Sequence, residues 1–367
     1  MRIVVAPDKF AGTLSAGEAA SAIATGWQRT CPGDELLLRP MADGGPGFLD
    51  VLASGLDVTR HTHSVPNQYG APTEADILMA GSTAYLESAQ VVGLHLTDRR
   101  DPEVATSAGI GHLISHAIDL GATHIVVGLG GTATNDGGAG LLAALGATSK
   151  SAALNAGPAG LAGITDVDLQ PALDRLAGVT VVAATDVDSV LTGLFGATKT
   201  FGPQKGLAED RLPIVDGWLQ EWAAATDKKL ATKPGTGAAG GIGFALQLLG
   251  ATRVSGFDVV AEAIDLAQTI AAADLVITGE GAFDFSSRAG KVPYGVAHVA
   301  AEALRPCIAL AGQVLVGSRE MRALGIESAY SVVDLLGEER AFGDPAGALA
   351  DLSARVARTW GGRRTQE

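Results

Sequence analysis

The residues best suited to chemistry lie in a glycine-rich stretch, GGTATNDGGAG, which follows the apolar run HIVVGL. A strand, a glycine-rich turn and a helix form an anion-binding shape, because backbone N–H groups converge where the helix begins. The candidate phosphate-binding residues are Gly130, Gly131, Thr132, Thr134 and Asn135. The carboxylate of Asp136 in the same stretch predicts a metal ion.

Five further loops carry glycine or charged groups and are interpreted as following strands: APDKFAGT, MADGGPG, TDVDS, FGPQKG and TGEGAFDFSSRAGK. In open α/β sheets ligands bind beyond the carboxyl ends of the strands, so these loops are predicted to share one site. Phosphoryl transfer needs such a set: N–H groups and cations around phosphates, carboxylates for Mg²⁺, and a base near the accepting hydroxyl.

Two carboxylates, Asp186 and Asp188, follow the apolar run TVVAAT. They would point to one face if the strand continued through them. Two carboxylates on one face repel unless a cation or a shared proton is present, which favours a Mg²⁺ site or a general base. The alternative is a solvated turn. Asp43 in MADGGPG and Asp136 also have a structural alternative, since Asp before Gly often accepts hydrogen bonds from its own turn.

Two lysines in these loops, Lys205 and Lys291, can bring an ammonium group to a phosphate, although surface lysines are also ordinary. Four histidines occur as two close pairs, His61 with His63 and His112 with His116. Neither pair has the glutamate of the H-E-x-x-H motif, so no zinc site is assigned.

Other nucleotide-binding motifs fit poorly. PGTGAAGGIG contains G-x-G-x-x-G, but KKLATKP precedes it where a dinucleotide fold needs a buried strand. GLGGTA does follow a strand, yet no acidic residue lies near position 150 to hold a ribose, which argues against a dehydrogenase. RAGKV lacks both the leading glycine and the Ser or Thr of a Walker A loop.

Apolar runs alternate with helical stretches along the chain, which is typical of parallel α/β structure. Ser15 and Glu18 predict a capping box at the start of the first helix. TRHTHSVPNQYGAPTEADIL alternates apolar and polar residues, as antiparallel strands do. The predicted strands are Ile3–Ala6, Leu36–Arg39, Ile125–Gly128, Val179–Ala184, Leu275–Thr278, Ile308–Ala311 and Ala329–Val332.

The two chain ends look alike and the middle differs, so we expect one discontinuous α/β domain, residues 1–56 plus 262–367, and an inserted mixed-sheet α/β domain, residues 57–261. The active site is expected in the cleft between them. The net charge of −14 and pI of about 4.9 argue against nucleic acid as a partner. Two cysteines make no disulfide framework, no signal peptide opens the chain, and no apolar run is long enough for a membrane span. A soluble cytoplasmic protein is expected.

Several of these segments together resemble the bacterial type I glycerate kinase family (glycerate 2-kinase-like). Its pattern includes APD-x-F-K-G-[ST]-L, P-M-A-D-G-G-E-G, GG-[ST]-A-T-N-D-G-G-x-G, F-G-P-Q-K-G, G-x-G-A-A-G-G-x-G and D-L-V-I-T-G-E-G followed by G-K. Matching segments run in the family's order over most of this chain. The chain departs from the pattern at Ala11, where the family has Lys, at Pro46, where it has Glu, and at Ala282, where Arg is frequent.

The resemblance implies ATP-dependent phosphorylation of D-glycerate, typically at the 2-hydroxyl, on a flavodoxin-like domain with a second α/β domain inserted. A kinase for another small hydroxy acid, and a non-catalytic phosphate-ligand binding protein, stay open as alternatives. ATP and Mg²⁺ are the expected cofactors, and a homodimer is left open.

The roles expected for the candidate residues combine loop chemistry with this resemblance. The catalytic residues are Asp186 or Asp188 as base, with Lys205 and Lys291 neutralising the transferred charge. The substrate-binding residues are Asp8, Lys9, Asp43, Gly44 and Gly45, with Lys9 for the carboxylate. The nucleotide-binding set adds Gly237, Gly240 and Glu280 to the five phosphate-binding residues, and the metal ligands are Asp43 and Asp136.

Overall fold

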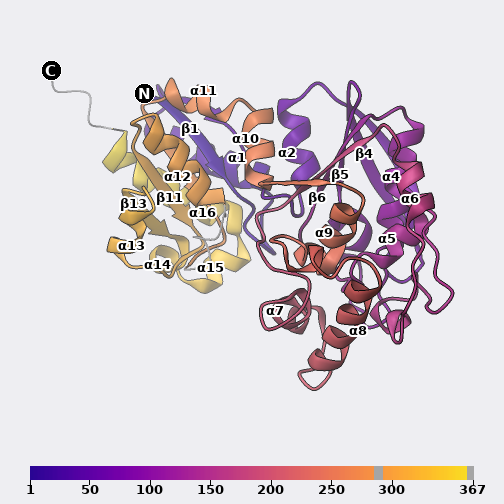
Figure 1. Cartoon of the computed structure of the whole chain (residues 1–367). Coiled ribbons are helices and arrows are strands. Elements are labelled where there is room, and N and C mark those ends of the chain that lie inside the picture. The colour runs from indigo at the N-terminus through magenta and orange to yellow at the C-terminus, as the bar shows by residue number, and fades with distance from the viewer. Residues whose placement is uncertain (285–291, 362–367) are drawn as a thin grey trace. The chain divides into compact units, whose positions relative to one another are not determined.

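A computed structural model describes residues 1–284 and 292–361 of the chain. The chain divides into two compact units, residues 1–43, 50–56 and 257–367 in the first and residues 44–49 and 57–256 in the second. Figure 1 shows the first unit in the colours of both chain ends, indigo and orange to yellow. We call it the chain-end unit, and the second the inserted unit.

The chain-end unit contains a five-stranded sheet with the order β13-β11-β9-β1-β2, and all neighbouring strands in it are parallel. Numbered along the chain within this sheet, the strands run 2-1-3-4-5 across it, which is the flavodoxin order. A separate two-stranded parallel sheet pairs β10 with β12. The strands are β1 Arg2–Pro7, β2 Glu35–Leu38, β9 Leu275–Gly279, β10 Ala282–Phe283, β11 Cys307–Ala311, β12 Gln313–Val314 and β13 Ser328–Ser331.

Helices connect these strands, as parallel pairing requires. They are α1 Ala16–Thr30, α2 Phe48–Gly55, α10 Gly256–Ala263, α11 Leu266–Ala271, α12 Val292–Glu302, α13 Ser318–Ala323, α14 Val332–Leu336, α15 Glu338–Gly343 and α16 Pro345–Trp360. The capping box predicted at Ser15 and Glu18 is confirmed. Helices α1 and α16 approach closely because Gly26 has no side chain: a Cβ there would lie 1.9 Å from the carbonyl oxygen of Ala350.

The inserted unit contains a six-stranded mixed sheet in the order β3-β4-β5-β6-β7-β8. The first three strands pair antiparallel, as the alternating TRHTH segment predicts, and β5 to β8 pair parallel. The strands are β3 Thr59–Pro66, β4 Pro72–Ala80, β5 Thr83–Glu87, β6 His124–Gly128, β7 Thr180–Ala184 and β8 Thr252–Val254. Fully buried apolar residues such as Ile77, Ile125 and Leu141 form its core.

The helices of the inserted unit are mostly short. They are α3 Ala89–Val92, α4 Ala108–Asp119, α5 Ala139–Ala144, α6 Gln170–Arg175, α7 Ala197–Phe201, α8 Leu212–Ala225 and α9 Ala238–Leu248, with 3-10 turns η1 Leu94–Leu96, η2 Pro158–Leu161, η3 Pro203–Lys205 and η4 Leu230–Thr232. All seven strands predicted from the sequence are present. Within the described residues, no helix has the length and apolar character needed to cross a bilayer.

Candidate active site

The strand order of the chain-end unit reverses between β1 and β9, and the loops that follow these two strands carry predicted site residues. Asp8 and Lys9 follow β1, and Glu280 follows β9. The backbone N–H of Asp8 donates to the carbonyl oxygen of Gly279 at 2.8 Å, which ties the two loops together. Such a switch point is where open α/β sheets bind ligands.

Asp8 and Lys9 form an ionic cluster with Asp43. The Lys9 ammonium lies 3.4 Å from Asp43 Oδ1 and 3.6 Å from Asp8 Oδ1, and the Lys9 backbone N–H donates to Asp8 at 2.7 Å. Asp8 is only 7% exposed. Burial raises its pKa to about 6, with Lys9 opposing and Asp43 adding to the shift. Burial alone would lower the pKa of Lys9, but the two carboxylates raise it above its ordinary value. The cluster thus holds a cation beside a carboxyl group that titrates near neutral pH.

Three further predicted site residues are Glu280, expected to bind the nucleotide, and Gly44 and Gly45, expected to bind the substrate. Glu280 is buried at 6% exposure. Gly44 and Gly45 belong to the inserted unit, where a Cβ at Gly44 would lie 2.6 Å from the carbonyl oxygen of Ala184. Gly44 also has φ of 92°, so its lack of a side chain is needed for both the turn and the close approach.

The sequence predicts that the stretch after β6 offers free N–H groups to an anion at the start of a helix. In the structure, the first N–H groups of this helix already have partners. The carboxylate of Asp136 accepts hydrogen bonds from the N–H and hydroxyl of Ser107 at 2.8 Å each, and from the N–H groups of Gly138 and Gly140 at 3.0 and 3.2 Å. The Leu141 N–H donates to the Ser107 hydroxyl at 3.0 Å. Asp136 and Ser107 therefore occupy the first N–H groups of α5. The sequence alone could not show that these N–H groups are paired, and the phosphate-binding role of residues 130–135 stays a prediction.

These four hydrogen bonds also bear on the metal prediction. Mg²⁺ prefers carboxylate oxygens that are open to it, and the Asp136 oxygens already face four donors from its own unit. Among the described residues, no group of three or more His, Cys, Asp or Glu side chains could hold a metal ion. The contacts support a structural role for Asp136, and its role as a metal ligand gains no support from them.

Two polar atoms just before Asp136 have no internal partner. Thr134 Oγ1 and Asn135 Oδ1 are buried without a hydrogen-bond partner among the described residues. The Asn135 amide N–H₂ donates to Thr198 Oγ1 at 2.9 Å, which fixes the side chain. Because burying an unpaired polar atom is costly, such atoms mark a place where a polar ligand can bind. The hydroxyl can donate to a phosphate oxygen, and the amide oxygen can accept from a ligand hydroxyl.

The remaining glycines of this stretch allow close packing. A Cβ at Gly130 would lie 2.7 Å from Gly45 Cα, and one at Gly131, where φ is 64°, would lie 2.8 Å from Pro46 Cγ. Thr132 is buried and forms an isolated bridge with Gly93. These residues therefore shape the loop within the inserted unit.

Lys205 is buried, although its sequence context suggests a mobile loop. FGPQKG follows helix α7 and not a strand, and Lys205 closes η3 with 3% exposure. Its ammonium donates to the Thr134 carbonyl oxygen at 2.6 Å. Burial lowers its pKa to about 7, opposed by the charge of Asp136, and burial raises the pKa of Asp136. Lys205 thus stabilises the 130–136 loop through this buried hydrogen bond.

The glycines of PGTGAAGG serve the same loop. Helix α9 is kinked, with left-handed backbone at Ala239, Gly240 and Gly241. A Cβ at Gly240 would lie 1.9 Å from the Thr134 carbonyl oxygen. A Cβ at Gly237 would lie 2.6 Å from Ser189 Oγ. The motif lets α9 and the 185–189 loop pack tightly, which explains it without a dinucleotide.

The carboxylates after β7 differ from the expected pair on one strand face. The strand ends at Ala184, so Asp186 and Asp188 lie in a loop. Asp186 is half-buried, whereas the Asp188 side chain is 80% exposed and pairs with Arg253 at 2.6 Å. Because the strand does not continue through them, the two carboxylates do not share a strand face. Asp188 belongs to an ion pair on the surface. Lys291 lies outside the described residues.

Three polar residues at this site were not identified from the sequence. Ser107 binds Asp136, Thr198 binds Asn135, and Ser189 Oγ is buried without a partner in the described part of the chain. Ser107 and Thr198 come from helix starts distant in sequence, and no local pattern marks them. Ser189 lies within the TDVDS loop, where its position next to the two carboxylates was the only signal.

Residues 3–361 match the protein family described as the glycerate kinase family. The chain belongs to this family. It is 39% identical to the glycerate 2-kinase of Escherichia coli (strain K12), with 92% of each chain covered. It is 41% identical to an uncharacterised protein of Mycobacterium tuberculosis, covering 97% of this chain and 91% of the relative. A solved structure of a glycerate kinase 2 from Salmonella typhimurium LT2 superposes with a TM-score of 0.79 at 36% identity and covers 98% of both chains.

Membership of the glycerate kinase family makes the chain an enzyme of the kinase type, and a nucleotide is therefore one of its substrates. The two α/β units with a flavodoxin-order sheet and a mixed sheet agree with the fold of the solved relative. The resemblance noted in the sequence is thus confirmed.

Proposed function

We propose that the chain transfers the γ-phosphoryl group of ATP to D-glycerate, at its 2-hydroxyl. Its relatives include proteins named glycerate kinase in Bacillus subtilis and glycerate 2-kinase in Escherichia coli, each at 39% identity over at least 90% of both chains. The departures at Ala11, Pro46 and Ala282 leave the fold of the family intact, because the match extends over residues 3–361.

The observation that carries the acceptor assignment is the Asp8–Lys9 pair at the switch point. A 2-hydroxy acid has a carboxylate and a hydroxyl on neighbouring carbons. The Lys9 ammonium and the Asp8 carboxyl lie 3.6 Å apart, a spacing that matches those two groups. Lys9 would bind the carboxylate, and Asp8 would accept the hydroxyl proton as the oxygen attacks phosphorus.

Asp8 fits the role of general base better than the two carboxylates predicted from the sequence. A base works best with a pKa near the operating pH, and burial raises the pKa of Asp8 to about 6. Asp188 is 80% exposed and paired with Arg253. We propose Asp186 as a positioning or metal-facing group, and Glu280 as a further residue near the acceptor.

The nucleotide is proposed to use the unpaired polar atoms of the inserted unit. Thr134 Oγ1 would donate to a phosphate or ribose oxygen, Asn135 Oδ1 would accept from a ribose hydroxyl, and Lys205 would keep their loop in place. Lys291 stays a candidate for phosphate binding from sequence. We propose that Mg²⁺ enters with ATP, since Mg²⁺ keeps several waters and needs only one or two protein carboxylates. Asp43, with a third of its side chain exposed, is the carboxylate that fits. When bound, the ion would screen phosphate charge.

The remaining assignments also stay proposals. They are a cytoplasmic protein, domain limits at residues 56/57 and 261/262, and an active site that uses loops of both domains.

ADP release on adding D-glycerate to the protein with ATP tests the proposal. We expect turnover that requires both glycerate and Mg²⁺ or Mn²⁺ and stops in excess EDTA. ATP binding without any glycerate-dependent ADP would overturn it and favour a phosphate-ligand binding protein. Full turnover in excess EDTA would remove the metal from the account. Phosphorus NMR of the product would distinguish the 2-phosphate from the 3-phosphate.

A further inference from the structure

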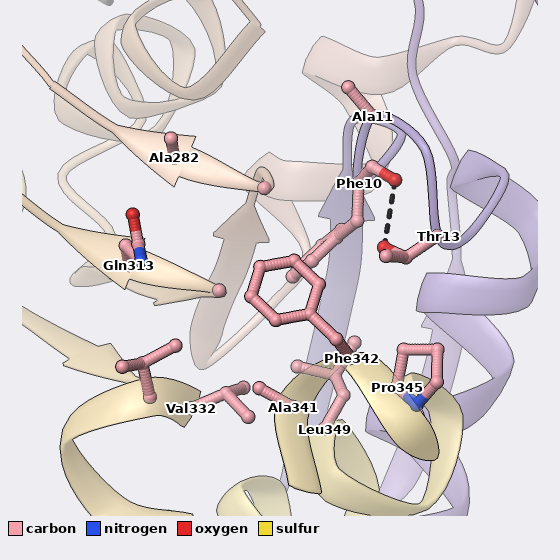
Figure 2. A pocket seen from close by; sticks show the side chains of 13 residues that line it. Phe10, Ala11, Thr13, Ala282, Gln313, Val332, Ala341, Phe342, Pro345 and Leu349 are labelled. Carbon is pink, nitrogen blue, oxygen red and sulfur yellow. Dashed lines mark hydrogen bonds between the residues drawn. The ribbon is translucent and has the colours of Figure 1, made fainter. Parts of the chain in front are cut away.

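The chain-end unit contains a cavity of about 240 Å³ beside the switch-point loops (Figure 2). Its walls come from the loop after β1, from β10 and β12, and from helices α14 to α16. Figure 2 shows side chains from these elements facing a common space. Its lining residues include Phe10, Ala11, Ala282, Gln313, Ala341 and Phe342.

The chemistry of the walls is apolar. No charged side chain is among the described residues that line the cavity. Thr13 is one of the polar lining residues, and its hydroxyl already donates to the Phe10 carbonyl oxygen at 2.9 Å. Phe342 lines the cavity although it is 63% exposed, so an apolar ring is held at the opening in contact with water. A ligand that covered the Phe342 ring would bind more tightly, because apolar surface would be removed from water.

The cavity adjoins the proposed acceptor site through the chain itself. Phe10 and Ala11 directly follow Lys9, and Ala282 comes two residues after Glu280. The two loops touch, since a Cβ at Gly281 would lie 3.2 Å from the Ala11 backbone nitrogen. The two loops that carry the proposed acceptor residues therefore also line the cavity.

Two small side chains keep the cavity uncharged. Ala11 and Ala282 are two of the positions at which this chain departs from the family pattern, and both line this cavity. A methyl group at each position leaves room and brings no charge. The two departures thus act on the same space, which ties them to one change in ligand chemistry.

We propose that the cavity binds an apolar alkyl or aryl substituent of the hydroxy-acid acceptor, so that the chain phosphorylates substituted 2-hydroxy acids as well as glycerate. Its volume of about 240 Å³ exceeds the ~150 Å³ of a cavity that holds benzene, so one ring or a branched alkyl group fits. The acceptor oxygen forms a bond to the γ-phosphorus, the bond from that phosphorus to the bridging oxygen breaks, ADP leaves, and the hydroxyl proton passes to Asp8.

This inference rests on the proposed function, and the test separates the two. ADP release is measured at saturating ATP and Mg²⁺ with D-glycerate, with 3-phenylglycerate and with 2,3-dihydroxy-4-methylpentanoate, all matched in configuration at C2. Because apolar pockets distinguish single methylene groups by roughly 10–200-fold, kcat/KM should be at least about tenfold higher for one substituted acid than for glycerate. Turnover of glycerate alone overturns the inference and keeps the proposed function. Turnover of none overturns both.

Variants that fill or open the cavity sharpen the test. Ala341→Leu projects a larger side chain into the cavity from α15 and should lower the ratio of kcat/KM, substituted acid over glycerate, by about tenfold. Ala346→Leu adds the same atoms at an exposed position of α16 and should leave that ratio unchanged. If Ala341→Leu does not fold, Phe342→Ala, at a largely exposed position, should lower the same ratio. A raised KM for ATP with an unchanged acceptor ratio would assign the cavity to the nucleotide base and overturn the inference.

Discussion

Two loops, one in each unit, follow a parallel strand and carry an aspartate, and the two aspartates make different contacts. After β6, Asp136 accepts four hydrogen bonds from Ser107, Gly138 and Gly140 and so serves the loop itself. After β1, Asp8 accepts one backbone hydrogen bond, from Lys9, and faces an ammonium group and a second carboxylate. The number of internal donors already bound separates an acid that holds the fold from one that is available to a substrate.

The largest effect should come from Asp8→Asn. Removing a general base costs about 10²–10⁴ in kcat, and the amide keeps the side-chain volume, so the melting temperature should stay close to that of the unchanged protein. ADP release with D-glycerate and a thermal melt measure both. Asp188→Asn is the matched control, because that side chain is 80% exposed, and it should retain nearly full activity. Nearly full activity in Asp8→Asn would return the role of base to the loop after β7.

Asp136→Asn should produce the next effect, on stability. An amide offers one acceptor oxygen and turns an N–H₂ group toward backbone N–H donors, in a site that is 0% exposed. Breaking a buried charged network of this kind costs about 3 kcal/mol. Chemical denaturation measures the free energy of unfolding, with Asp188→Asn again as control. A stable variant that needs far more Mg²⁺ for activity would instead support the metal-ligand role.

Lys205→Met tests whether the inserted loop is held for the nucleotide. Methionine is an unbranched side chain one atom shorter than lysine, and it lacks the ammonium that binds the Thr134 carbonyl oxygen. We expect the KM for ATP to rise roughly tenfold, with a smaller change in the KM for glycerate. Lys228→Met, at an exposed position, should change neither constant. Equal changes in both constants would argue against a specific link to the nucleotide.

A smaller, pH-dependent effect should come from two stacked histidines. His63 on β3 and His116 on α4 have ring centroids 4.4 Å apart, and His63 Nε2 is buried without a partner among the described residues. Burial, then the neighbouring His116 and His61, lowers the pKa of His63 below its usual value. The stability from this neutral ring is complete above about pH 6.5 and is lost as the pH falls through the lowered pKa.

Melting temperatures between pH 5 and 8 check this sign. His63→Phe keeps a stacking ring without a titrating group and should show a smaller loss on the acid side. His112→Phe, at an exposed position of α4, should follow the unchanged protein. Identical pH dependence in the unchanged protein and His63→Phe would contradict a lowered pKa of His63 in the folded state.

The elements of this fold were predictable where local pattern decides them. Buried strands such as Leu275–Gly279 are continuous apolar runs, and the Ser15–Glu18 capping box is a local signal. Contacts between distant segments were not. Nothing near Asp136 in sequence shows that Ser107 fills its hydrogen-bonding capacity, and nothing near His63 shows that its partner is His116. One histidine from each of the two pairs noted in the sequence, His63 on β3 and His116 on α4, stacks on the other.

The candidate site shows the same division. Sequence reasoning found the loops that bear charge, and it put Asp8 and Lys9 at a strand end, where they lie. It could not tell a lysine that reaches ligands from one that supports a loop, because burial of Lys205 depends on packing around η3. The predicted end of β7 at Ala184 is confirmed, so the condition under which Asp186 and Asp188 would share a strand face is not met.

The pH dependence of kcat/KM for D-glycerate tests the central claim, that the charge of Asp8 serves the reaction, most directly. Burial raises the pKa of Asp8 to about 6, and the base must be ionised to accept a proton. We expect kcat/KM to fall on the acid side with a midpoint near pH 6, and below that pH by about tenfold per pH unit. The residual activity of Asp8→Asn should not show this fall. A rate that is unchanged from pH 7 to 5, or the same fall in Asp8→Asn, would contradict this claim.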